Sequence, residues 1–564
     1  MSQLFFKSKT ASYYATQSIN ELLYSQVFTN AVWTLTNGTL TAGQTDPSGG
    51  STAYTFKATS ANATLLQTVD AGLLSNKVFS IYLKRKTGTG NISLTINGAN
   101  YTVTAITGAW ARYSITAAVS GSISCGVKVS TLNDEVYVAW AQLETGNTAA
   151  TYVANTSSRL TVTQITDTDY PVNTTRGCAY LDGTFYVMTP DGTINGSDLE
   201  DAASWNALNF IQAIIQPGAG VYLTNYQSYV MALKQYSTEF FYDAANPAPG
   251  SPLGSVPSMA FSIGCASEDS VKQIAGSIIW MGQMLDGQGR GIFRMNGTTP
   301  EKISDTSVEK ILDADDLAEV SSWVCKVGSH TLYGLTLGTV GVTLVYDFEA
   351  GIWTLWTYLT NDGDGTTITA ISATGTVTAE GHPYSDGKIV NISGTGISDG
   401  FQVATNVTAD TFDIQNYGAA FSGSATCDGY TEDVFPIIAS TASGGFQWMQ
   451  TATGGNLYVL SESIYSDPVG AIAARIRTNK WDGGTSDWKR ISSTELVGDK
   501  VSTYCLIRKT DNDYVTYSGF RSMNMEADRT WVKACGRTSR RALELLHVEN
   551  SAFRVEALEI ETQR

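Results

Sequence analysis

Acidic side chains in the middle of the chain offer one chemistry, the hydrolysis of glycosidic bonds. A glycoside hydrolase needs two carboxyl groups that face each other across a cleft, at roughly 5–5.5 Å or roughly 6.5–9.5 Å. The sequence does not place any two acids at such a separation. We therefore expect no enzymatic activity and no catalytic residue, and we keep a polysaccharide-degrading hydrolase as the least favoured alternative. The available acids are Glu239, Asp243, Asp305 and Glu309.

Histidine and cysteine are poorly placed for metal or nucleophilic chemistry. None of the three histidines, His330, His382 and His547, lies near a cysteine or a carboxylate pattern with metal-ligand spacing. The chain has neither a GxxxxGKS/T phosphate-binding loop nor a GxSxG nucleophile motif. The seven cysteines are scattered and never spaced as CxxC, which indicates reduced, buried residues. We expect no metal and no cofactor.

Two groups of residues are candidates for binding. Trp110 and Tyr113 could stack on a sugar ring, although aromatic residues in strands more often belong to a core. Arg537, Arg540 and Arg541 form the one dense cationic patch, which could contact DNA or an acidic partner. The competing interpretation of this patch is a solvated turn or a salt-bridged subunit surface.

Length and composition restrict the class of protein. The 564 residues suffice for several domains, with many Gly residues, 10% aromatic residues and only 15% charged residues, which is a β-rich composition. The net charge is −17, so the chain is not built to grip a polyanion, and DNA should slide past it. The N-terminus lacks the apolar region of a signal peptide, and no apolar run is long enough to span a membrane. We expect a protein made in the cytoplasm without membrane insertion.

The elements that position these residues are strands. From about residue 31 to residue 154, short runs alternate apolar and polar residues between Gly, Asn and Ser turns, which predicts a two-sheet antiparallel sandwich. Trp33, Trp110 and Trp140 are predicted to be core residues of this sandwich.

A repeat of about 50 residues follows. Pairs of strand-like runs begin at Cys178, Tyr229, Ser277 and Thr331, with intervals of 51, 48 and 54 residues. A further pair at Gly445 comes too late, and an inserted segment over residues 366–430, with its own strand pattern, explains the delay. Such a repeat predicts β-propeller blades. Asp-Gly steps at Asp182-Gly183, Asp191-Gly192 and Asp286-Gly287 are predicted to form the hairpin turns.

One segment is predicted to be helical. Thr306 can cap the amide of Glu309 while the Glu309 side chain reaches back, and Val308, Ile311 and Leu312 then share an apolar face. The sequence Asp316-Leu317-Ala318-Glu319 repeats the device and predicts a second short helix.

Two inserted segments resemble known modules. The residues WARYS at 110–114 and AQLETGNTAATYV at 141–153 resemble the closing strands of jelly-roll, carbohydrate-binding-module-like domains of phage tail proteins. The residues TAEGHPYSDGKIVNISG at 378–394 and FQVATNVTADTFDI at 401–414 resemble small FCCH-type β modules inserted in phage structural proteins. Neither resemblance implies catalysis.

The repeated half resembles the packaged-DNA stabilisation, or tail-hub, proteins of short-tailed phages. The resemblance rests on GCASEDSVKQIAGSIIWMGQ at 264–283, on VTLVYDFEAGIWTLW at 342–356 and on the C-terminal pattern at 528–561. SINELLY at 18–24 is similar to the short stretch that precedes the first blade in that family.

The resemblance implies a homo-hexameric ring in the virion tail, a nozzle below the portal-adaptor through which double-stranded DNA passes. Its expected partners are the portal-adaptor protein, tail fibres or spikes, and tip or needle proteins. The alternative is a receptor-binding tail protein that recognises a host surface glycan.

The predicted fold is all-β, a β-propeller with an inserted sandwich, a small β-barrel-like module and a C-terminal β-sandwich tip. The predicted segments are an N-terminal segment joining the propeller (1–30), the jelly-roll insertion (31–155), the first blades (156–365), the FCCH-type module (366–430), the closing part of the propeller (431–470) and the tip (471–564).

Overall fold

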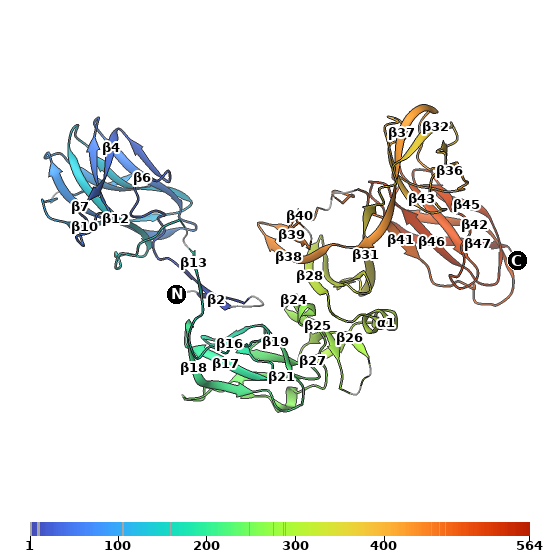
Figure 1. Cartoon of the computed structure of the whole chain (residues 1–564), viewed down its shortest axis with the longest axis horizontal. Helices are drawn as coiled ribbons and strands as arrows, with labels where there is room; N and C mark the ends of the chain where they lie inside the picture. Colours follow the sequence, from blue (N-terminus) through green and yellow to red (C-terminus); the bar gives the residue numbers. More distant parts are fainter. Residues whose placement is uncertain are drawn as a thin grey trace. The chain divides into compact units, whose positions relative to one another are not determined.

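The predicted all-β class is confirmed by the computed structural model of the chain (Figure 1). Within the described residues, the helices are α1 (Thr306–Ala314) and the 3-10 turns η1 (Pro257–Met259) and η2 (Glu268–Ser270). None of these helices combines the length and apolar character needed to cross a membrane. The structure describes residues 3–7, 12–103, 106–157, 160–247, 249–274, 276–285, 287, 289–452, 454–461, 463–467 and 470–563.

The chain divides into two compact units, which are described separately. Unit 1 contains residues 1–214, 222–232 and 240–256, and unit 2 contains residues 215–221, 233–239 and 257–564.

Unit 1 begins with the predicted two-sheet sandwich. Phe79, Ile81 and Leu83 alternate with outward residues and point into its core. Leu22 and Phe28 are buried in the same core, so the sandwich extends to the N-terminal side of residue 31. One sheet has the order β10 (Ala111–Val119), β7 (Ser75–Thr87), β12 (Glu135–Thr145), β5 (Ala53–Ala58), β4 (Gly38–Gln44), and the other has the order β3 (Trp33–Thr36), β6 (Ala63–Asp70), β11 (Ser122–Val129), β8 (Ile92–Ile96), β9 (Ala99–Val103).

The segments predicted as blades, together with the N-terminal strands, form six smaller antiparallel groups of strands. The first three are β1 (Gln3–Lys7), β2 (Ser12–Gln17), β13 (Leu160–Gln164); β15 (Ala179–Leu181), β16 (Thr184–Met188), β17 (Thr193–Asp198), β18 (Asp201–Gln212); and β19 (Gly220–Tyr226), β20 (Tyr229–Lys234), β21 (Thr238–Asp243), β22 (Leu253–Ser255), with the short parallel β14 (Arg176–Gly177) beside β19. The last three are β23 (Gly264–Cys265), β24 (Lys272–Ile274), β25 (Ser277–Gln283), β26 (Arg290–Asn296), β27 (Thr299–Lys302); β28 (Val320–Val327), β29 (His330–Leu337), β30 (Val342–Asp347), β31 (Ile352–Asn361); and β38 (Ile437–Ser443), β39 (Phe446–Thr451), β40 (Leu457–Val459).

Successive groups within a unit pack face to face. In β16, Phe185 and Val187 share a core with Phe5 of β1, whereas Tyr186 and Met188 point the other way and share a core with Leu223 of β19. Alternate residues of one strand thus serve two neighbouring sheets, because side chains alternate across a strand. This is the packing of propeller blades.

The same rule holds in unit 2. In β29, Tyr333 and Leu335 pack against Ile279 of β25, while Leu332 lies in the core shared with Ile437 of β38 and Met449 of β39.

Helix α1 begins at a different cap from the one predicted. The Asp305 carboxylate, not the Thr306 hydroxyl, accepts the amide hydrogens of Ser307 and Val308, at 2.8 and 2.9 Å. Asp is as good an N-cap as Thr or better, and it lies one residue earlier. Val308 and Leu312 are buried and Ile311 packs beside them, as predicted.

The predicted second helix is wrong. Residues 316–319 form a turn that leads into β28. The Asp316 carboxylate accepts the Ala318 amide at 2.9 Å, and Leu317 adopts a φ of 64°, which a right-handed helix does not allow.

The inserted module has its own core and a ribbon that leads back to the blade. The long strand β37 pairs with β31 over Thr357–Asn361 and also forms part of the module. Ile368, Val390, Phe412 and Cys427 are fully buried in the module core. Its strands are β32 (Thr366–Ile371), β33 (Thr376–Thr378), β34 (Ile389–Ser393), β35 (Gly400–Val403), β36 (Thr411–Asp413) and β37 (Phe421–Val434).

The C-terminal segment is a sandwich, as predicted, and it is packed against the inserted module. Val403 and Tyr430 of the module share a buried cluster with Leu506, Phe520 and Leu546 of the sandwich. Its sheets are β41 (Ala474–Arg477), β46 (Ala542–His547), β43 (Tyr504–Thr510), β44 (Arg521–Asn524), and β45 (Trp531–Thr538), β42 (Lys489–Gly498), β47 (Val555–Gln563).

Candidate functional site

The aromatic residues of the jelly-roll sandwich do not lie where the sequence places them. Trp33 is in the core, but Trp110 and Trp140 are half-buried and lie outside it, which corrects the prediction for these two residues. Tyr113 points the other way: it pairs with Ile81 and packs against the core. Of the two candidate sugar contacts, only Trp110 therefore lies outside the core.

Trp110 has a polar neighbourhood that a ligand could use. Its ring lies 6.2 Å from that of Tyr137, and the Tyr137 ring carries the ammonium groups of Lys84 and Lys86 at 5.6 and 5.5 Å. The Trp110 indole nitrogen is buried and has no hydrogen-bond partner among the described atoms. Six other buried side-chain atoms of the described residues, among them the Trp323 indole nitrogen, also lack a partner.

Trp140 belongs to a different structure. It occupies an irregularity of β12 with a φ of 54°, stacks on Tyr152 at 5.4 Å and donates to Thr52 at 2.9 Å. The segment that contains Tyr152 folds back over the sheet, where the Ala150 amide donates to Glu144 at 3.0 Å. The chain itself therefore covers this part of the outer face.

The predicted cationic patch is not one surface. Arg541 is buried and forms a bidentate pair with Asp511, at 2.7 and 2.9 Å. Arg540 is exposed and pairs with Asp513 at 2.6 Å, whereas Arg537 is exposed and has no charge partner within the described part of the chain. Of these three arginines, only Arg537 and Arg540 are exposed at the protein surface.

The candidate acids all have partners in the protein. Glu239 is fully buried, pairs with Lys234 at 3.4 Å and accepts the amide hydrogens of Ile215 and Gln216. Asp305 caps α1, and Glu309 pairs with Lys302 at 2.8 Å. The Asp243 carboxylate accepts the Ala245 amide at 2.7 Å, as in a turn.

The structure brings one histidine to two carboxylates, which the sequence analysis missed. His330 Nδ1 lies 2.7 Å from Asp347, and the ligand atoms of His330, Asp347 and Glu349 lie within 4.8 Å of one another. These residues are 17 and 19 positions apart and meet because β29 and β30 form a hairpin, whose register was the available signal. Glu349 is already engaged by the amide and hydroxyl of Thr331.

None of the seven cysteines forms a disulfide, and all but Cys178 are buried. Burial raises the pKa of the Cys265 and Cys427 thiols to about 12. These thiols stay protonated and unreactive at neutral pH.

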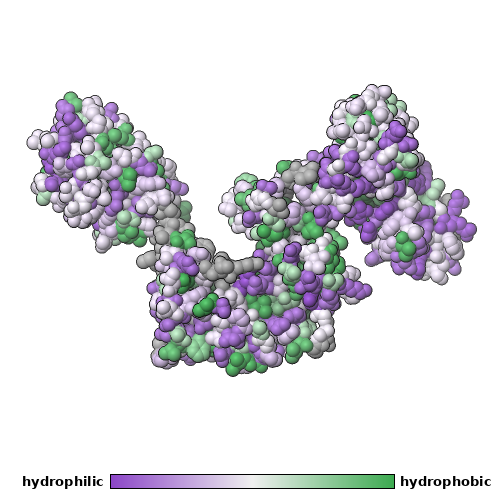
Figure 2. All heavy atoms as spheres, in the orientation of Figure 1, coloured by the Kyte–Doolittle hydropathy of each residue, from purple (hydrophilic) through white to green (hydrophobic). Residues whose placement is uncertain are grey.

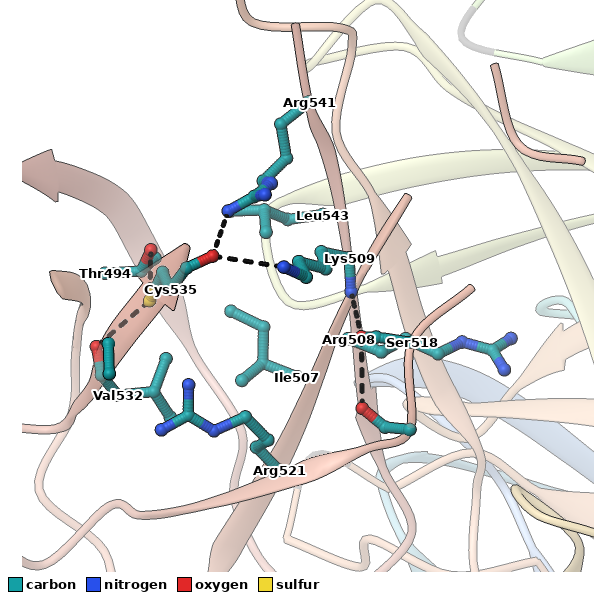
Figure 3. Close-up of a pocket in the computed structure, with 12 residues that line it drawn as sticks. Thr494, Ile507, Arg508, Lys509, Ser518, Arg521, Val532, Cys535, Arg541 and Leu543 are labelled. Atoms are coloured by element: carbon teal, nitrogen blue, oxygen red, sulfur yellow. Dashed lines mark hydrogen bonds between the residues drawn. The ribbon is translucent and has the colours of Figure 1, made fainter. Parts of the chain in front are cut away.

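A pocket of about 350 Å³ opens in the C-terminal sandwich (Figure 3). Its aliphatic wall consists of Ile507, Val532 and Leu543, and its cationic residues are Arg508, Lys509, Arg521 and Arg541. No acidic residue belongs to the described lining. The lining thus has only cationic charged residues although the chain as a whole is negative, and two of them, Arg541 and Arg508, are paired with Asp511 and Glu544.

An irregularity in β45 shapes this pocket. Ile491 pairs with Gly536 and Ser493 with Lys533, so Ala534 and Cys535 lie opposite Ser492 alone. Ala534 consequently has a φ of 57°, an uncommon conformation for alanine. The carbonyl of Cys535 accepts hydrogen bonds from Lys509 at 3.1 Å and from Arg541 at 2.6 Å (Figure 3).

A buried carboxylate lies near this pocket. Glu544 of β46 has no exposed side-chain surface and contacts three guanidinium groups: Arg475 at 2.7 Å, Arg477 at 2.6 Å and Arg508 at 2.6 Å. Burial alone would raise the pKa of Glu544, but the three arginines outweigh burial and lower it. Arg475 also reaches Glu432 of the inserted module, at 3.1 Å.

Comparison with known proteins gives one informative match. The model of a family described as "Bacteriophage P22 Gp10, beta-propeller" matches residues 111–380. The matched segment runs from the start of β10 into the inserted module and contains the groups of strands from β15 to β31. This match supports a phage tail protein. No curated protein matches the chain.

Similarities to solved structures are slight. The enzymatically active domain of tailspike protein 4 of bacteriophage CBA120 is 18% identical with a TM-score of 0.20, over 23% of this chain and 22% of that domain's chain. The CBM22-1 xylan-binding domain of Paenibacillus barcinonensis Xyn10C is 15% identical (TM-score 0.18; 25% of this chain, 100% of that one). An exo-beta-1,3-galactanase of Phanerochaete chrysosporium is 11% identical (TM-score 0.22; 70% and 98%). Similarities at this level carry no argument about function.

Proposed function

We propose that the chain is a structural component of a phage tail, the hub or nozzle that extends the DNA channel below the portal-adaptor. The observation that carries the proposal is the family match over residues 111–380, which includes groups of strands packed face to face as blades. In this proposal the protein is a non-enzymatic virion protein, assembles as a homo-hexameric ring, retains the packaged genome and holds fibres or spikes.

The charge of the chain supports this role. A lumen lined by a protein with a net charge of −17 repels the phosphate backbone and lets the duplex move without adhering. The cationic side chains described above are largely taken up by local pairs, such as Arg541 with Asp511 and Arg540 with Asp513. Of the three arginines of the predicted patch, Arg537 is the one whose guanidinium has no paired carboxylate among the described residues.

Electron microscopy of the purified full chain, with and without the portal-adaptor ring, tests the proposal. We expect hexameric rings that stack on the adaptor. Particles of another symmetry that do not bind the adaptor would contradict the proposal.

A receptor-binding role is the alternative, and Trp110 is the observation in its favour. Its half-buried ring, beside Tyr137 and two lysines, offers a partly exposed aromatic face to a sugar. A glycan array probed with the full chain and with Trp110→Ala tests this alternative. If the parent chain binds a glycan and Trp110→Ala does not, the receptor-binding role is favoured. If neither protein binds, this role is excluded for the glycans on the array.

A further inference from the structure

The pocket of the C-terminal sandwich contrasts in charge with the rest of the protein. The chain has 52 acidic and 35 basic residues, yet the described lining has four basic residues and no acidic one. The sandwich surface seen in Figure 2 is largely hydrophilic, so the apolar wall of this pocket is also a local exception.

Three of the four cations have hydrogen-bond donors to spare. Arg521 is exposed, and its guanidinium has no hydrogen-bond or ion-pair partner among the described residues, while its backbone pairs with Ile507. Lys509 uses one of its three ammonium donors on the Cys535 carbonyl. Arg541 directs three of its five N–H groups to Asp511 and Cys535, which leaves two.

The fourth cation is occupied elsewhere. Arg508 contacts Glu544 at 2.6 Å, its guanidinium lies 4.2 Å from the Tyr517 ring, and its side chain is directed away from the pocket (Figure 3). The guanidinium of Arg521 instead points back towards Val532 (Figure 3). The free donors therefore gather around the space bounded by Ile507, Val532 and Leu543.

We propose that this pocket binds a carboxylate group carried on a short aliphatic body. A guanidinium fork matches the two oxygens of a carboxylate, and charge-assisted hydrogen bonds of this kind are stronger than neutral ones. The aliphatic wall requires an apolar body, which a free phosphate or sulfate lacks. The described lining contains no aromatic ring on which a sugar could stack.

The size of the pocket limits the ligand. A volume of about 350 Å³ lies at the lower end of the range for small-ligand sites, roughly 300–1,000 Å³. One branched aliphatic residue with its carboxylate fits, and the group can come from a free small acid or from the C-terminal residue of a protein. This binding is independent of ring assembly, so either can fail without the other.

Titration of the full chain, by calorimetry and by ligand-detected NMR, tests the proposal. The probes are 4-methylpentanoate, its neutral amide, inorganic phosphate, and a tetrapeptide ending in leucine as the free acid and as the amide. We expect the acids to bind with a Kd of about 1 mM or below, and the amides and phosphate at least about tenfold more weakly. A tetrapeptide acid that binds about tenfold tighter than 4-methylpentanoate identifies a protein terminus as the source, and equal affinities identify a free acid.

Arg521→Ala is the decisive variant, because this side chain has no partner whose loss would unfold the sandwich. We expect it to weaken binding of the acids about tenfold or more. Arg537→Ala is the matched control, since it removes an exposed arginine of the same sandwich outside the pocket lining. The proposal is overturned if acid and amide bind alike, if neither binds the parent chain, or if Arg521→Ala binds like Arg537→Ala.

Discussion

At the scale of single residues, the buried carboxylate of Glu544 stabilises the C-terminal sandwich because three arginines neutralise it. Glu544→Gln leaves those guanidinium groups facing a neutral amide, and we expect it to lower the free energy of unfolding by about 3 kcal/mol. Chemical denaturation at neutral pH measures this loss. Glu556→Gln, which removes an exposed partner of Arg554, is the control and should cost less than about 1 kcal/mol. Equal effects in the two variants would refute the role assigned to Glu544.

The same carboxylate predicts how the stability of the folded protein changes with pH. Because the pKa of Glu544 is lowered in the folded protein, its contribution is complete above the unfolded pKa of about 4.3 and is lost as the pH falls through the lower folded value.

His547 gives a second pH dependence of stability, at a higher pH than that of Glu544. Burial lowers the pKa of His547 to about 4, while its Nε2 lies 2.9 Å from Thr503 and its ring stacks on Phe553. The neutral ring therefore stabilises the fold fully above pH about 6.5, and this contribution, about 3 kcal/mol, is lost as the pH falls from about 6.5 to about 4. In His547→Gln we expect a flatter stability profile across that window. A profile with the slope of the parent chain would show that His547 does not titrate there.

Residue types alone predicted part of this picture. The cysteines were expected to be reduced and buried; none forms a disulfide, and all but Cys178 are buried. Arg537, Arg540 and Arg541 looked alike in the sequence, but Arg541 is buried because residue 511, which is 30 positions away, supplies its carboxylate. Such long-range pairing has no signature in local sequence.

At the scale of elements, two residues at the start of α1, Asp305 and Thr306, are candidate N-caps, and mutation of each distinguishes between them. Asp305→Ala removes the acceptor for two amide hydrogens, so we expect it to cost about 1 kcal/mol of stability. Thr306→Ala should be close to neutral, because Thr306 is not the cap. Thermal or chemical denaturation compares the two variants. If Thr306→Ala lost more stability than Asp305→Ala, Thr306 would be the cap, as the sequence predicted.

Turn chemistry was predictable where it is local. Asp182 and Gly183 have φ values of 44° and 89° and join β15 to β16, as the Asp-Gly step predicts. Gly192 also has a positive φ, whereas Asp286 of the third step lies outside the described residues. Residues 316–319 show where local prediction fails. An acidic residue can begin a helix or an Asx turn, and here the turn forms because strand β28 follows directly.

At the scale of the whole molecule, the proposed ring needs partners for exposed apolar side chains. The long strand β18 exposes Leu208 by 58% and Phe210 by 45%. In a closed ring each subunit contributes two different surfaces, and a neighbouring copy is the expected cover for such residues. We expect Leu208→Ser combined with Phe210→Ser to reduce hexamer formation about tenfold or more without changing the circular dichroism spectrum. Sedimentation velocity measures the assembly, and an unchanged hexamer population would remove β18 from the interface.

The sequence by itself determined the all-β class, the sandwich, the blade repeat and the inserted module, because alternation and repeat length are written in consecutive residues. Only the tertiary structure decided that Trp110 and Trp140 lie outside the core, that His330 meets two carboxylates, and that the inserted module packs on the C-terminal sandwich. The same holds for the cationic pocket, whose lining spans residues 494–543 and both sheets of the sandwich. Contacts between strands depend on register and sheet packing, and these are set by the summed burial of many distant residues rather than by any local pattern.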